Sequence, residues 1–165
     1  MKPLLALLLV AGALPLAGCQ LRPVYSNSGP SGALLNSVAV AAIPDRSGWL
    51  VRQALIDRLG EPPASPAYRL EVELDDQIQG FGVRGDDAIT RERRILRARY
   101  RLVAASNGEV LLDATAGSDA GIDVVQSEFA VLAAENTALE RLAEDIANNI
   151  VTRLALFGRN LPPKQ

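Results

Sequence analysis

The hydrophobic positions of the chain change their spacing along its length, and each spacing predicts a different kind of element. A short apolar run over residues 38–43 lies between polar and proline positions, which is typical of a buried strand. Apolar residues then recur at helical spacing over residues 49–59, and Gly60 ends this predicted helix. Trp49 opens the helix, and we expect its indole to pack in the core.

Residues 68–75 alternate between apolar and charged side chains, which is the period of a strand with one buried face. The apolar positions then move from even to odd numbers between Ile78 and Phe81. A strand makes this change when it contains an extra residue, so we expect a β-bulge near residues 79–80. Residues 85–87, Gly-Asp-Asp, supply the reversal into the next strand.

The strand after this reversal, residues 91–102, has mostly apolar or small side chains at its even positions. Residues 106–108, Ser-Asn-Gly, predict a turn, and a further strand begins over residues 110–115. Residues 117–123 are mostly small, and we predict a loop there.

The C-terminal part of the chain carries the longest helical pattern. Apolar side chains spaced by threes and fours run from Phe129 to Phe157, with Ser127 placed to cap the first turn and Gly158 to end the helix. A helix of this length covers a whole sheet face. Together the elements predict an α+β fold: a two-layer sandwich with a largely antiparallel four-stranded sheet and two helices on one face, in the order β-α-β-β-β-α.

An apolar segment with a different character precedes the folded region. Lys2 comes before an apolar run over residues 4–16, which is shorter than the roughly 20 residues of a transmembrane helix. Small residues then lead to Cys19, the only cysteine, in the order Leu-Ala-Gly-Cys. This order predicts a secretory signal peptide whose last four residues resemble a bacterial lipobox. We expect cleavage before Cys19 and lipid chains on its sulfur and amine; the alternative is an ordinary signal peptide with an incidental cysteine.

The chain therefore divides into four predicted parts. They are a signal peptide over residues 1–18, the lipidated cysteine with a linker over residues 19–35, one α+β domain over residues 36–158, and a disordered tail over residues 159–165. Gln20, rather than an aspartate, follows the cysteine, which in lipoproteins of this kind directs the protein to the outer membrane. We expect a domain tethered by lipid to that membrane.

The composition excludes several classes of function. Histidine is absent, so no Ser-His-Asp or Cys-His pair can form and the commonest metal ligand is missing. The formal charge of −2 does not indicate a nucleic-acid partner, and aromatic residues make up only 4%. We predict no enzymatic activity, no metal, and no cofactor beyond the covalent lipid on Cys19. A hydrolase built on carboxylates such as Asp76 or Asp87 is the remaining enzymatic alternative.

Basic side chains are concentrated on one predicted strand. Its odd positions carry arginine, interrupted only by Ile95, and the alternation of a strand sends these side chains to the same side of the sheet. They are Arg91, Arg93, Arg97, Arg99 and Arg101. In one interpretation they pair with Glu71 and Glu73 on the preceding strand. In the other they form a surface that binds a partner or an anionic lipid. Both interpretations are open at this point.

Short stretches taken in order along the chain carry a family resemblance. They are Gly-Cys-Gln-Leu-Arg-Pro-Val-Tyr at residues 18–25, Tyr-Arg-Leu at 100–102 with Asn-Gly at 107–108, and Ser-Glu-Phe-Ala at 127–130 with Asn-Thr-Ala at 136–138 and Arg-Leu at 153–154. This order resembles the LptE family of lipopolysaccharide-assembly lipoproteins in its α-proteobacterial form, over essentially the whole mature chain. The chain departs from the family at Gln20-Leu21, where Gly-Phe is usual, and at Phe129, where tyrosine is common.

The resemblance implies a non-enzymatic role. A member of this family sits as a plug inside the LptD β-barrel of the outer membrane, helps to assemble that barrel and assists lipopolysaccharide delivery to the outer leaflet. For this chain it implies an LptD-type barrel and lipopolysaccharide as partners, and a domain on the periplasmic side or in the barrel lumen. The alternative is an auxiliary lipoprotein of a lipid-trafficking ABC transport system, which also has a lipidated cysteine and a small α+β domain.

Overall fold

The computed structural model describes residues 30–83 and 89–161 of the chain. Several predictions fall on other residues. The signal peptide, Cys19 and the first part of the predicted linker lie outside the described residues, as do the reversal at residues 85–87 and the last four residues of the predicted tail. These stay predictions.

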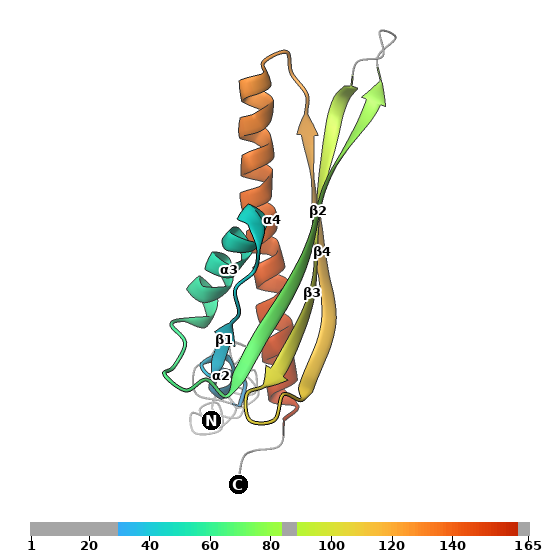
Figure 1. Cartoon of the computed structure of the whole chain (residues 1–165). Coiled ribbons are helices and arrows are strands. Elements are labelled where there is room, and N and C mark those ends of the chain that lie inside the picture. The colour runs from blue at the N-terminus through green and yellow to red at the C-terminus, as the bar shows by residue number, and fades with distance from the viewer. Residues whose placement is uncertain (1–29, 84–88, 162–165) are drawn as a thin grey trace, which may run out of the picture.

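The fold is α+β, with a sheet as one layer and helices as the other (Figure 1). In chain order the elements are α2 (Pro30–Leu35), β1 (Val38–Val40), α3 (Asp45–Leu59), β2 (Tyr68–Val83), β3 (Ile89–Ala104), β4 (Val110–Asp123) and α4 (Glu128–Arg159). The strands lie in the order β1-β2-β3-β4; β1 pairs with β2 in parallel and the other neighbours are antiparallel. The predicted fold class is confirmed. Within the described parts of the chain, no helix is long and apolar enough to cross a membrane.

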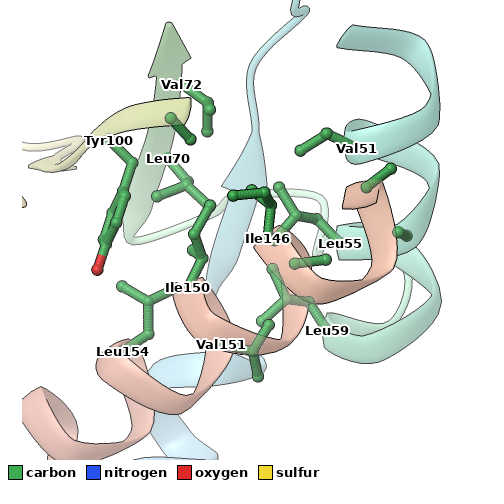
Figure 2. Packing of buried hydrophobic residues seen from close by; sticks show 14 of the residues in the cluster. Val51, Leu55, Leu59, Leu70, Val72, Tyr100, Ile146, Ile150, Val151 and Leu154 are labelled. Carbon is green, nitrogen blue, oxygen red and sulfur yellow. The ribbon is translucent and has the colours of Figure 1, made fainter. Parts of the chain in front are cut away.

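The core lies between α4, α3 and one face of the sheet (Figure 2). Leu55 of α3, Leu70 of β2 and Ile150 of α4 are fully buried, and Tyr100 of β3 is 2% exposed. Figure 2 shows these side chains converging from the two layers. Burial of one aliphatic side chain stabilises a fold by about 1.5–3 kcal/mol relative to an exposed one. The strand alternation and the α4 stripe read from the sequence therefore meet in one core.

A helix lies where the end of the linker was predicted. Leu34 and Leu35 of α2 are buried in the core, and the Ser31 hydroxyl donates a hydrogen bond to the Ala155 carbonyl oxygen of α4 at 2.9 Å. The linker prediction is therefore wrong for residues 30–35, and the described helix layer has three helices rather than two. A helix of six residues is too short to show a period, and it depends on α4 for the apolar surface that holds it.

Helix α3 begins four residues before the predicted start, and this changes the place of Trp49. Gly48 lies against the preceding segment so closely that an added Cβ would stand 2.7 Å from the Ile43 carbonyl oxygen. Val51 and Leu55 take the core positions of the helix, and Trp49 is 62% exposed. The prediction that Trp49 is a core residue is wrong, because the close approach at Gly48 sets which side of α3 faces inward.

The pairing of β2 with β3 keeps one register along its described length. The bulge predicted near residues 79–80 is therefore absent from this hairpin, and that prediction is wrong. Ile78 and Phe81 lie on opposite faces of β2 and are 43% and 45% exposed. Because the two side chains are not both buried on one face, the strand needs no extra residue between them. The irregularity lies instead between Leu102 and Val103, where β3 pairs with β4.

Residues 117–123 continue β4 and do not form the predicted loop. Their backbone pairs with β3 over this whole stretch, with Gly117 opposite Arg97. Small side chains give little indication of a strand, but the main-chain hydrogen bonds of a sheet do not depend on side-chain size. The predicted turn at residues 106–108 is confirmed, and Gly108 has the positive φ of 74° that glycine adopts without strain.

The predicted N-cap of the long helix is confirmed, whereas its end lies slightly later. The Ser127 hydroxyl accepts a hydrogen bond from the Ala130 N–H at 3.4 Å, and α4 continues to Arg159. Leu161 packs on the core beyond the helix. The prediction of a disordered tail is therefore wrong for residues 159–161.

The apolar stripe of α4 is not buried along its whole length. Leu139 is 2% exposed and Leu154 is fully buried, whereas Leu132 is 54% and Phe129 88% exposed. Figure 1 shows the first turns of α4 extending beyond α3. The expectation that the stripe covers a sheet face is correct from Leu139 onward and wrong for the first turns of the helix.

Candidate functional site

The five predicted site arginines lie together on the outer face of the sheet, which is the face opposite the helices. This face is formed by the odd-numbered side chains of β2, β3 and the paired part of β4. On β3 the even-numbered side chains from Leu96 to Leu102 are buried, and the arginines between them are exposed or half-exposed. No described helix covers this face in Figure 1. The alternation therefore places all five guanidinium groups at one solvent-facing surface.

Most of these arginines are paired with carboxylates of β4. Two nitrogens of Arg99 bind the Asp113 carboxylate at 2.8 and 3.1 Å, which is the bidentate geometry that a guanidinium fork favours. Arg93 donates to Asp119 at 2.9 Å. The same kind of contact joins Arg91 to Asp123 at 3.2 Å. The sequence analysis missed Asp119 and Asp123 because residues 117–123 were predicted to form a loop. Asp113 lay inside the predicted strand and was not considered as a partner; the aspartates at odd positions were the available signal.

The pairing predicted with β2 is confirmed for one arginine. Arg101 lies 3.2 Å from a Glu73 oxygen and 3.4 Å from a Glu71 oxygen. Glu71 also binds Arg69 of its own strand at 2.7 Å. Charges of both signs therefore alternate across the three strands, and the outer face is not a surface of bare cations.

Hydrogen bonds from the arginines change the titration of their partners. The Arg99 guanidinium lowers the pKa of Asp113, and Arg93 lowers the pKa of Asp119 in the same way. A carboxylate whose pKa is lowered in the folded state stabilises the protein at pH values above the ordinary pKa of an aspartate. This stabilisation is lost as the pH falls through the lowered pKa. All four side chains are solvent-exposed, so the contribution of each pair is small. The pairs mainly fix where the charges point.

Arg97 differs from the other four. In the part of the chain that the structure describes, its guanidinium makes no ion pair and no side-chain hydrogen bond. Its cross-strand neighbours are Asp75 on β2 and Gly117 on β4. A hollow of about 510 Å³ lies beside Arg97, between β2 and β4. The structure therefore places one unpaired guanidinium in the middle of the paired row.

A second charged cluster lies on the inner face of the sheet, beyond the hydrophobic core. Arg94 binds both oxygens of Asp76 at 2.7 and 2.9 Å and donates to the Glu135 carbonyl oxygen of α4 at 3.1 Å. The side chains of Arg94 and Asp76 are only 13% and 20% exposed. The sequence analysis did not single out Arg94; its signal was a charge at an even position of β3. This pair joins the hairpin to α4 where apolar contacts become few.

Glu92 lies near this cluster, but one oxygen of its carboxylate has no hydrogen-bond partner among the described residues. This atom, Oε2, is buried. Desolvation, and then the nearby charge of Glu135, raise the pKa of Glu92 above its ordinary value of 4.5. A raised pKa in the folded state means that charging Glu92 opposes folding.

We expect Glu92→Gln to stabilise the protein at neutral pH by up to about 0.5 kcal/mol, because the amide carries no charge at this site. The gain should shrink as the pH falls through 4.5 and disappear about one unit lower, where residue 92 is neutral in the folded and unfolded states of both proteins. Thermal melts of the two proteins between pH 3.5 and 8 measure the difference. Glu144→Gln on the exposed side of α4 is the matched control. A gain that persists at acidic pH contradicts this explanation.

Comparison with known protein families decides to which group this fold and charged face belong. The model of the lipopolysaccharide-assembly family LptE matches residues 35–154 of the chain. The chain belongs to the LptE family. Among curated proteins, none matches the chain significantly. The family resemblance stated from the sequence is therefore confirmed.

Solved lipoprotein structures share the LptE-like fold. A putative lipoprotein from Caulobacter crescentus is 28% identical, with a TM-score of 0.67 over 81% of this chain and 100% of that chain. A minor lipoprotein from Acinetobacter baumannii is 15% identical, with a TM-score of 0.61 over 79% and 97%. Rare lipoprotein B from Shewanella oneidensis is 10% identical, with a TM-score of 0.57 over 73% and 92%. The latter two likenesses concern the fold alone.

Membership in the LptE family gives the general function. The chain is a lipoprotein that takes part in lipopolysaccharide assembly at the outer membrane, in a family that is not catalytic. Its partners belong to the lipopolysaccharide transport system in general. The binding role of the five arginines and the lipidation of Cys19 stay predictions for this chain.

Proposed function

We propose that this LptE-family protein is the plug subunit of an LptD-type outer-membrane β-barrel and that it assists lipopolysaccharide delivery to the outer leaflet. The observation that carries the proposal is the outer face of the sheet: three long strands present charges of both signs, and no described element covers them. The interior of a wide membrane barrel is polar. A plug needs a polar surface of this kind toward the barrel wall, with its apolar core enclosed.

The arginines act in this proposal together with their carboxylate partners. A hypothesis from the sequence is that Arg93, Arg97, Arg99 and Arg101 form a cationic surface for acidic groups of the barrel or phosphates of lipid A. Three of these four are already neutralised within the sheet, by Asp119, Asp113, Glu71 and Glu73. We therefore revise the hypothesis to a mixed polar face that matches a polar barrel wall, in which Arg97 is the arginine without an ion-pair partner among the described residues.

The proposed lipid anchor on Cys19 precedes α2, the first helix that the structure describes. Helix α2 lies beside the C-terminal end of α4, where Ser31 binds the Ala155 carbonyl oxygen. The residues from Cys19 to Pro30, where α2 starts, span at most about 40 Å when fully extended. A lipid on Cys19, with no further cofactor, would hold this end of the domain near the membrane, on the periplasmic side or in the barrel lumen.

Affinity purification from solubilised outer membranes tests the proposal. The full chain carries a C-terminal tag and its own Cys19, and mass spectrometry identifies what is retained in a mild detergent. We expect one large β-barrel protein in a one-to-one ratio, absent when an unrelated tagged lipoprotein of the same membrane is used. Retention of an inner-membrane ATPase complex instead would contradict the plug proposal and favour an auxiliary lipoprotein of an ABC transport system.

A further inference from the structure

The outer face contains one break in its pattern of ion pairs. Arg91, Arg93 and Arg99 each bind an aspartate of β4, and Arg101 binds glutamates of β2. Arg97 lies between paired neighbours on the same strand and has no such partner among the described residues. The five arginines share one strand and one solvent-facing side, so the difference arises from the residues that face them on the neighbouring strands.

The facing strands explain why Arg97 is left unpaired. On β4, Arg93 and Arg99 each bind the aspartate that lies two positions before the residue directly opposite them. For Arg97, which lies opposite Gly117, that position is the uncharged Thr115, and Gly117 itself has no side chain to offer. On β2 the residue opposite is Asp75, whose carboxylate accepts two hydrogen bonds from the Gln77 amide at 3.0 and 3.1 Å. The Asp75 carboxylate is therefore hydrogen-bonded within its own strand, and neither Thr115 nor Gly117 of β4 offers a carboxylate to Arg97.

The missing side chain leaves room beside the guanidinium. The hollow of about 510 Å³ lies among residues of all three strands. The residues of the outer face that line it are Glu73 and Asp75 of β2, Arg97 and Arg99 of β3, and Thr115 and Gly117 of β4. A Cβ added at Gly117 would lie 3.8 Å from Cγ of Arg97, so a side chain at that position would fill the hollow along the arginine. An acidic side chain from another molecule can occupy the same space.

We infer that Arg97 and the hollow over Gly117 form a socket for a single carboxylate side chain of the partner protein. The inference rests on the proposed function, in which the outer face meets a barrel wall. Guanidinium and carboxylate match as a bidentate pair, and Arg99 with Asp113 shows this geometry on the same face. Glu73 and Asp75 at the rim disfavour a doubly charged phosphate more strongly than a singly charged carboxylate.

Two variants that act in opposite ways test the socket against the purified partner barrel. Arg97→Gln removes the charge, and Gly117→Glu supplies the missing carboxylate from within the chain and fills the hollow. We expect each to weaken binding of the full-length lipoprotein to the barrel by about tenfold or more, with little change in the midpoint of thermal unfolding. Arg141→Gln, which removes an exposed arginine of α4 rather than one of the outer face, is the control and should change the affinity less than about threefold.

The outcomes separate the socket from the proposed function. Equal losses for Arg97→Gln and Arg141→Gln, or no loss for Arg97→Gln, overturn the socket. If the barrel still binds the wild-type protein, the plug proposal stands. Failure of the wild-type protein to bind the barrel overturns the plug proposal. The socket is then judged by the NMR signal of the Arg97 Nε–H group during titration with a blocked Gly-Glu-Gly peptide. A saturating shift that is lost in Gly117→Glu and weaker with inorganic phosphate supports the socket; no shift, or an equal one with phosphate, overturns it.

Discussion

Substitution of Cys19 by serine should remove the lipid and take the protein out of the outer-membrane fraction. Serine lacks the thiol that accepts diacylglycerol, so neither the thioether nor the later acylation can form. A buried acyl methylene contributes about 0.8 kcal/mol, and two or more chains are needed for stable anchoring. Loss of all chains therefore changes the membrane affinity by orders of magnitude, the largest functional effect that we expect of any single substitution in this chain.

Radiolabelled palmitate incorporation and density-gradient separation of the membranes measure this result. Ser26→Ala changes a small residue shortly after the proposed cleavage site and should be labelled and fractionated like the wild type. If Cys19→Ser still accumulates in the outer membrane with unchanged labelling, the lipobox interpretation is wrong. An unlabelled wild-type protein would favour the alternative of an ordinary signal peptide.

Ile150→Ala should lower the free energy of unfolding by about 2–5 kcal/mol, the largest expected effect on stability. Ile150 is fully buried in the C-terminal half of α4 and lies in the cluster formed with Leu70 of β2 and Tyr100 of β3 (Figure 2). Removal of its branched side chain leaves a cavity between layers that cannot close without moving a helix or a strand. A typical domain is stable by only about 5–15 kcal/mol, so this loss is severe.

Chemical denaturation of the chain from Gln20 onward, without the signal peptide and the lipidated cysteine, measures the change by circular dichroism. Phe129→Ala on the same helix is the control, because a side chain that is 88% exposed should contribute no more than about 0.5 kcal/mol. The two substitutions distinguish the buried part of the α4 stripe from its exposed start. Equal destabilisation by both would show that the first turns of α4 are also packed in the folded protein.

Regular alternation made the sheet predictable. The two-residue period of β2 and β3 placed Leu70 and Tyr100 inward and the five arginines outward, and both placements are found in the structure. The three-to-four spacing of the C-terminal stripe predicted α4 with its Ser127 cap. These patterns extend over many residues, so local exceptions do not obscure them.

Contacts between distant segments caused the errors. Six residues of α2 become helical because α4 offers Ala155 and an apolar surface to them. Trp49 turns outward because Gly48 packs closely on the preceding segment. The small residues of β4 become a strand because β3 supplies the hydrogen-bond partners, and no bulge is needed where Ile78 and Phe81 are both exposed.

The sequence by itself determined the fold class, the order of the long elements, the common face of the arginines and the family resemblance. Each depends on a periodicity or on residue types at fixed spacing, which the chain carries locally. Only the tertiary structure decided which arginines are free. Arg93 and Arg99 are neutralised by aspartates of β4, whereas the corresponding position for Arg97 is the uncharged Thr115. Ion pairing across a sheet depends on strand register, and register is fixed when the strands assemble over a shared core.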